Sequence, residues 1–205
     1  MPSKEALMIY ARSVAAYYPT MSVELRADYL KDMYNTAMQV PPHWTLDNGK
    51  GTNYDALKQL RWLRKDGVPG GTNTESEGIA WCGIFATYCL RCIGIPALWK
   101  QFKGISVDDG SLRLLAGYTN SDQIERGDIC VVKTNQHHFI VGDRNGDTLF
   151  SYDGNLPGQM IGERRYDIAA LREGVKKQAD YDKSDEGKAN PQSSKYSFYF
   201  YKMQY

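Results

Sequence analysis

Residues Gly78–Pro96, GIAWCGIFATYCLRCIGIP, place Cys82 directly after a tryptophan, at the start of an apolar segment with helical spacing. Gly94 and Pro96 predict where this helix ends. In the first turn of a helix, the backbone dipole and the unpaired N–H groups favour a thiolate, the form of cysteine that attacks carbonyl groups. The alternative is that Cys82 is a small buried apolar residue. We interpret the remaining cysteines in that second way: Cys89, Cys92 and Cys130. We expect the four cysteines to be mostly reduced.

Length and charge narrow the classes of function. The chain has 205 residues, of which 42% are hydrophobic, and 25 basic against 24 acidic side chains give a formal net charge of +1. This length predicts a single domain around one core. Nucleic-acid binders usually carry a concentrated basic excess, so we expect no nucleic-acid partner. No apolar run reaches the roughly 20 residues that span a bilayer, and no signal-peptide cleavage site is evident, so we expect no membrane contact and synthesis in the cytoplasm.

The order of the elements indicates the fold class. Apolar residues recur at helical spacing over Lys4–Tyr18, over Ser22–Gln39 with Ser22 as N-cap, and over Tyr54–Lys65. Later segments are short and β-rich: GDICVVKT, HHFIVGDRNGDTLFSYDGN and KYSFYFYKM. Between the last two, DIAALREGVKKQA predicts a helix and DYDKSDEGKANPQSSK an exposed, mobile loop. Helices first and strands later around one core predict an α+β fold, with the helices packed on a small antiparallel sheet.

A nucleophilic cysteine needs a general base, which is usually histidine. The chain has three histidines, and His43, in the segment PPHW, is best interpreted as a loop residue. His137 and His138 begin a β-rich segment that leads into Asn145-Gly146, a strong signal for a two-residue hairpin turn. The base is therefore expected at the start of this hairpin.

The register of the hairpin decides which histidine meets an acid. With Asn145-Gly146 as the turn, the directly opposed residues include His138 and Asp153, whose Cβ atoms would lie about 5 Å apart. A carboxylate there could fix the orientation of the imidazole. A three-residue loop with a bulge would instead place His137 opposite Asp153. Asn155, two residues further along, shares the face of Asp153 and could support it.

Three segments resemble a known family. WCGIFATYCLRCIGIP, IERGDICVV and HHFIVGDRNGDTLFSYDGN resemble, in the same order, the core segments of CHAP domains (cysteine, histidine-dependent amidohydrolases/peptidases) and of the related NlpC-type peptidases. Cys82 matches the nucleophile of the family, His138 its base, Asp153 its orienting acid and Asn155 the asparagine that follows. The family usually has one histidine after a small residue, so the sequence QHH leaves His137 as an alternative. The match covers residues 75–155.

The resemblance implies a fold, a reaction and partners. It implies a papain-like catalytic core over residues 67–163, preceded by N-terminal helices in residues 1–66 and followed by a helix, a mobile loop and a final strand in residues 164–205. The implied reaction is hydrolysis of an amide bond, most often in the peptide stem of bacterial peptidoglycan, with no metal or other cofactor. Without a signal peptide, such an antibacterial effector or phage lysin would be exported or delivered to the cell wall or periplasm. A secretion-system component and a cognate immunity protein would then be its partners.

Two other readings keep part of this interpretation. The same chemistry could serve a toxin that cleaves or deamidates a protein inside a host cell. Alternatively, the chain could be a non-catalytic binding module on a papain-like fold, in which some of its 15 tyrosines and 4 tryptophans stack on sugars or peptides. The presence of Cys82, His138 and Asp153 together favours an enzyme over a binding module.

Overall fold

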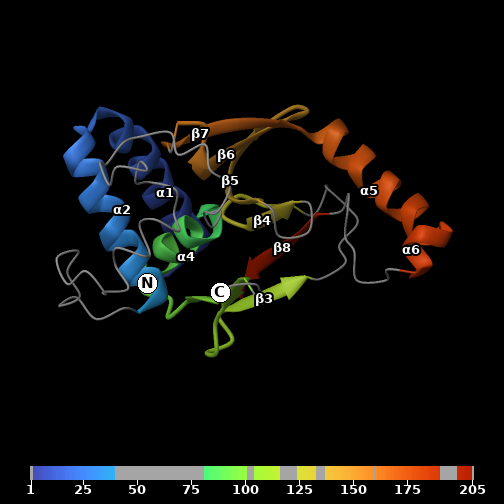
Figure 1. Ribbon diagram of the computed structural model, residues 1–205, viewed down its shortest axis with the longest axis horizontal. Helices are drawn as coiled ribbons and strands as arrows, with labels where there is room; N and C mark the ends of the chain where they lie inside the picture. Colours follow the sequence, from blue (N-terminus) through green and yellow to red (C-terminus); the bar gives the residue numbers. More distant parts are fainter. Residues whose placement is uncertain are drawn as a thin grey trace.

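The computed structural model describes residues 2–39, 81–100, 104–115, 124–132, 137–158, 160–189 and 198–204. The strands are β1 (Leu98–Lys100), β2 (Gly104–Ser106), β3 (Leu112–Leu115), β4 (Ile129–Val132), β5 (His137–Asn145), β6 (Thr148–Leu156), β7 (Met160–Asp167) and β8 (Phe198–Met203). Six of them form one antiparallel sheet in the order β3-β8-β4-β5-β6-β7, and β1 and β2 form a separate pair. Helices flank the sheet (Figure 1), so the predicted α+β class is confirmed.

The two N-terminal helices form where the sequence predicts them. Helix α1 spans Lys4–Tyr17 and helix α2 spans Val23–Met38, with a 3₁₀ turn, η1 (Tyr18–Thr20), between them. The hydroxyl of Ser22 accepts a hydrogen bond from the backbone N–H of Leu25, which confirms the predicted N-cap. The predicted helix at Tyr54–Lys65 lies outside the described residues.

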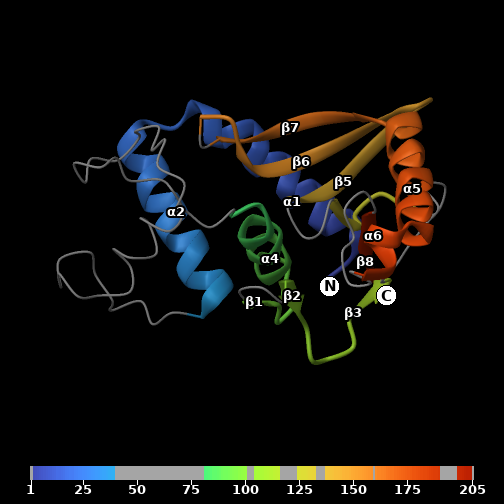
Figure 2. The same cartoon turned by 45° about the vertical axis from the view of Figure 1, so that its right-hand side comes forward.

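The faces of the sheet are covered by different helices. Helix α1 and helix α4 (Cys82–Cys92) pack with Val131 of β4 and Ile140 of β5 in the main core. Neighbouring residues in the same strands point the other way, and Cys130 and Phe139 form a smaller cluster with the start of helix α5 (Ile168–Lys183). Figure 2 shows α5 where β7 ends, apart from α1 and α4. Strand β4 and residues 138–142 of β5 are therefore buried on both faces, whereas residues 143–145 of β5 are exposed.

The register of the β5–β6 hairpin differs from the prediction. Asn145 pairs with Thr148, so the turn contains Gly146 and Asp147 rather than Asn145 and Gly146. The register then shifts between Val141 and Arg144, where β5 has one residue more than β6. This bulge reverses the alternation of side chains along β5. Phe139 is consequently opposite Asp153, and the predicted pairing of His138 with Asp153 is wrong.

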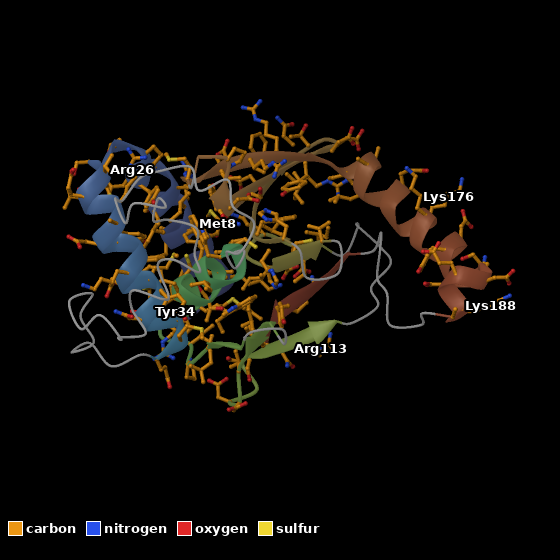
Figure 3. All side chains as sticks on the ribbon, in the orientation of Figure 1. Met8, Arg26, Tyr34, Arg113, Lys176 and Lys188 are labelled. Carbon is orange, nitrogen blue, oxygen red and sulfur yellow. The ribbon has the colours of Figure 1, made fainter. Side chains whose placement is uncertain are left out.

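The C-terminal part is more regular than predicted. Helix α5 confirms the predicted helix, but it continues to Lys183, and α6 follows at Asp185–Ala189. The prediction of a loop from residue 180 is therefore wrong as far as residue 189, and residues 190–197 lie outside the described residues. Figure 3 shows Lys176 and Lys188 on these two helices at the outer end of the molecule. Strand β7 crosses the expected boundary at residue 163, and β8 lies between β3 and β4.

Candidate active site

Cys82 is the first residue of α4 and is 1% exposed. Two tight contacts fix this end of the helix. A Cβ atom on Gly154 of β6 would lie 2.6 Å from Cβ of Phe85, and one on Gly83 would lie 2.1 Å from the ring of Trp99. Glycines at these positions let the helix approach its neighbours closely enough to bring Cys82 to the start of β5.

Both histidines at the start of β5 interact with Cys82. The backbone N–H of His138 donates a hydrogen bond to Sγ over 3.3 Å, and its ring Nδ1 lies 3.9 Å from the same atom. A side-chain hydrogen bond also links Cys82 to His137. The sulfur is therefore in reach of two imidazoles that come from successive residues of one strand.

Asp153 is buried, and its carboxylate is hydrogen-bonded to Nε2 of His137. Its carboxylate accepts hydrogen bonds from Nε2 of His137, from the hydroxyl of Ser151 and, over 3.1 Å, from the hydroxyl of Tyr166. The bulge in β5 is what brings His137 to this face. Cys82, His137 and Asp153 consequently form a continuous hydrogen-bonded chain, in place of the expected chain through His138.

The pKa of Cys82 is lowered and that of His137 is raised, and both shifts favour an ion pair between them. Burial disfavours the Cys82 thiolate, but the hydrogen bonds and charges of the two histidines outweigh it and lower the thiol pKa to about 6. Burial also disfavours a charged His137, but its hydrogen bonds to Asp153 and Cys82, with their negative charges, raise its pKa to about 9. Near neutral pH the pair is therefore thiolate and imidazolium, the reactive form of a cysteine nucleophile.

The other three cysteines differ from Cys82 in their described surroundings. All four are free, as expected. Cys89 and Cys130 are buried, as predicted, and burial raises the pKa of both thiols. Cys92 is exposed at the end of α4, so its interpretation as a buried residue is wrong. Among the described residues, Cys82 is the cysteine that contacts histidine side chains.

His138 and Asn155 are placed differently from what we expected. His138 is fully buried, meets the ring of Trp99 edge to face at 5.1 Å, and its Nε2 has no hydrogen-bond partner among the described residues. Asn155 is partly exposed and has a left-handed backbone (φ 59°), within the stretch between Asp153 and Leu156 where the β6–β7 register shifts. No hydrogen bond joins its side chain to Asp153 or to any other described residue, so the expected support of Asp153 is absent.

Three residues of the site were missed from the sequence: Ser151, Tyr166 and Trp99. Ser151 could have been found, because it is two residues before Asp153 in a strand and must share its face. Tyr166 is on β7. The β6–β7 register aligns Asp153 with Gly162, and Tyr166, four residues after Gly162, shares the same face of the sheet. No motif indicated Trp99.

In the described part of the chain, no group of three His, Cys, Asp or Glu side chains could hold a metal ion, and no helix is both long and apolar enough to cross a membrane. Comparison of the chain with protein-family models, with curated proteins and with solved structures finds no match.

Proposed function

We propose that the protein is a cysteine-dependent amide hydrolase with a papain-like core and that its substrate is the peptide stem of bacterial peptidoglycan. The observation that supports the reaction is the hydrogen-bonded chain from Cys82 through His137 to Asp153, with a lowered thiol pKa at one end and a buried carboxylate at the other. The order of the three sequence segments that resemble CHAP and NlpC-type peptidases supports the substrate class.

The first half of the reaction forms an acyl-enzyme. The Cys82 thiolate attacks the carbonyl carbon of the amide, and backbone N–H groups at the start of α4 stabilise the oxyanion. The C–N bond then breaks as His137, protonated in the resting pair, gives its proton to the leaving amine. Asp153 keeps the imidazole oriented and stabilises its charged form.

The second half restores the enzyme. Neutral His137 takes a proton from water, and the resulting hydroxide attacks the thioester carbon. The C–S bond breaks, Cys82 leaves as a thiolate, and His137 remains protonated. The sum of both halves is one amide and one water converted into a carboxylic acid and an amine.

Digestion of purified peptidoglycan tests the proposal. We expect wild-type protein to release fragments whose masses identify the cleaved bond, either the amide between sugar and peptide or one within the peptide. Cys82→Ala should release none, whereas Cys92→Ala, which changes an exposed thiol, should match wild type. If wild type releases no fragment, the peptidoglycan substrate is wrong; if Cys82→Ala is as active as wild type, the proposed nucleophile is wrong.

A further inference from the structure

His138 lies against the reacting sulfur without being part of the chain to Asp153. Its backbone N–H and its ring Nδ1 both face Sγ of Cys82. His137 and His138 are consecutive in a strand, so their side chains leave opposite faces of the sheet. The sulfur is thus approached by one imidazole that is tied to a carboxylate and by a second that is not.

The ring of His138 is held by packing. Trp99 of β1 contacts it edge to face, with the two ring planes at 83°. Gly104 of β2 is also close to the ring: a Cβ atom added there would lie 4.0 Å from Nε2 of His138 and 2.8 Å from the hydroxyl of Tyr201. The imidazole is therefore confined between the β1–β2 pair and the sheet, with Nδ1 directed at the sulfur.

The contacts of the His137 and His138 rings suit them to different roles, one as a general base and the other as a hydrogen-bond donor. A general base that becomes charged benefits from a carboxylate on its second nitrogen, and Asp153 provides this for His137. Nε2 of His138 is buried and has no partner among the described residues. A fixed N–H donor, in contrast, needs no partner on its second nitrogen in order to stabilise a neighbouring anion.

We propose that His138 is a second catalytic residue that acts as a fixed hydrogen-bond donor: its backbone N–H and its Nδ1–H hold the Cys82 thiolate, while His137 exchanges protons with the substrate. This assignment rests on the proposed role of Cys82 as the nucleophile. It separates two tasks, stabilisation of the thiolate and proton transfer, between two adjacent histidines.

A pair of amide substitutions tests the donor role. The side-chain NH₂ of asparagine reaches the position of the imidazole Nδ1, whereas that of glutamine reaches the position of Nε2. We measure the thiolate of Cys82 by its ultraviolet absorbance against pH, with the Cys82→Ser protein as the blank. We expect His138→Asn to titrate close to wild type and His138→Gln to titrate about one pH unit or more higher, since a hydrogen bond to a charged group contributes that order of free energy.

The controls keep the outcomes distinct. Thermal unfolding of both variants shows whether they fold, and because both introduce a buried amide, a difference in titration between them reports the position of the donor. Equal titration of the two folded variants overturns the proposal, as does full turnover in His137→Ala, because His138 would then be the base. Activity that persists in Cys82→Ser would instead refute the nucleophile and hence the proposed function itself.

Discussion

Asp153 is the residue that connects the candidate site to the sheet. Its carboxylate is fully buried and accepts hydrogen bonds from three side chains, of which only His137 reaches the cysteine. Burial of an ionised carboxylate is tolerated only where donors replace the lost water. In the proposed mechanism Ser151 and Tyr166 would be positioning residues, because they would act on the reaction through Asp153.

The pH dependence of turnover should follow the ion pair. We expect the rate to rise with pH as Cys82 ionises near its pKa of about 6 and to fall as His137 loses its proton near its pKa of about 9. Asp153 raises the pKa of His137, so Asp153→Asn should move the upper limb toward neutral pH. Asp143→Asn, which changes an exposed carboxylate paired with Arg126, should leave the profile unchanged. An upper limb that stays in place in Asp153→Asn would contradict the role of Asp153.

Removal of the Tyr166 hydroxyl should weaken both the fold and the site. Tyr166→Phe keeps the ring that stacks on Phe139 at 4.4 Å but takes one donor from the buried carboxylate. We expect the free energy of unfolding to fall by about 1–3 kcal/mol in urea denaturation. Tyr17→Phe, at an exposed tyrosine, is the matched control and should change stability by less than about 0.5 kcal/mol. Equal stability of the two variants would exclude a role of Tyr166 in holding Asp153.

Part of the residue-level site could be predicted from sequence. Cys82 was found because it follows a tryptophan at the start of an apolar segment with helical spacing. Asp153 was found because the hairpin places it opposite one of the two histidines and because it matches the acid of the resembled family. The choice between His137 and His138 could not be made, because a side chain changes face with each residue of a strand. A one-residue error in the predicted register of the hairpin is enough to exchange the faces on which His137 and His138 lie.

The β-bulge in β5 is the element that determines the site. Moving the turn by one residue, from Asn145-Gly146 to Gly146-Asp147, would still have left His138 on the face of Asp153. The additional residue of β5 between Val141 and Arg144 places His137 there. The turn sequence does not predict such a bulge, because the bulge depends on how both faces of β5 are packed. The hairpin could therefore be predicted from sequence, but its register could not.

A side chain at Gly154 should disrupt the packing of α4 against β6. A methyl group there would overlap Phe85 and Trp81, next to both Cys82 and Asp153. We expect Gly154→Ala to lower the free energy of unfolding by about 1–3 kcal/mol and to reduce turnover, since overpacking displaces the helix. Gly162→Ala is the control, because the new methyl group would meet only the flexible end of Leu156, at 3.2 Å. Comparable stability of the two variants, measured by thermal unfolding, would contradict this packing.

At the scale of the whole molecule, a buried ion cluster joins the two ends of the chain. Asp128, fully buried before β4, pairs with Lys4 of α1 at 3.2 Å and with Lys202 of β8 at 2.9 Å, and Glu125 contacts both lysines at the surface. Because β8 lies inside the sheet, next to β4, the C-terminal residues complete the sheet that carries the histidines. The sequence predicted β8 as a strand, but its place in the sheet depends on contacts between distant segments.

Asp128 should contribute far more to stability than Glu125. Asp128→Asn removes the buried one of the two carboxylates that Lys4 and Lys202 share and leaves them the exposed Glu125. We expect a loss of about 2–4 kcal/mol in urea denaturation. Glu125→Gln removes an exposed partner of the same lysines and should cost less than about 1 kcal/mol. If the two losses are equal, the cluster does not tie the chain ends together.

The most direct test of the proton-transfer chain is chemical rescue of His137→Ala. The side chain of His137 is 21% exposed, so its removal leaves a space that added imidazole can reach. On the peptidoglycan fragments that wild type cleaves, we predict that His137→Ala is at least about a hundredfold slower and that added imidazole restores part of the rate. Cys82→Ala should not respond to imidazole. Turnover of His137→Ala at the wild-type rate without imidazole would contradict the assignment of His137 as the base.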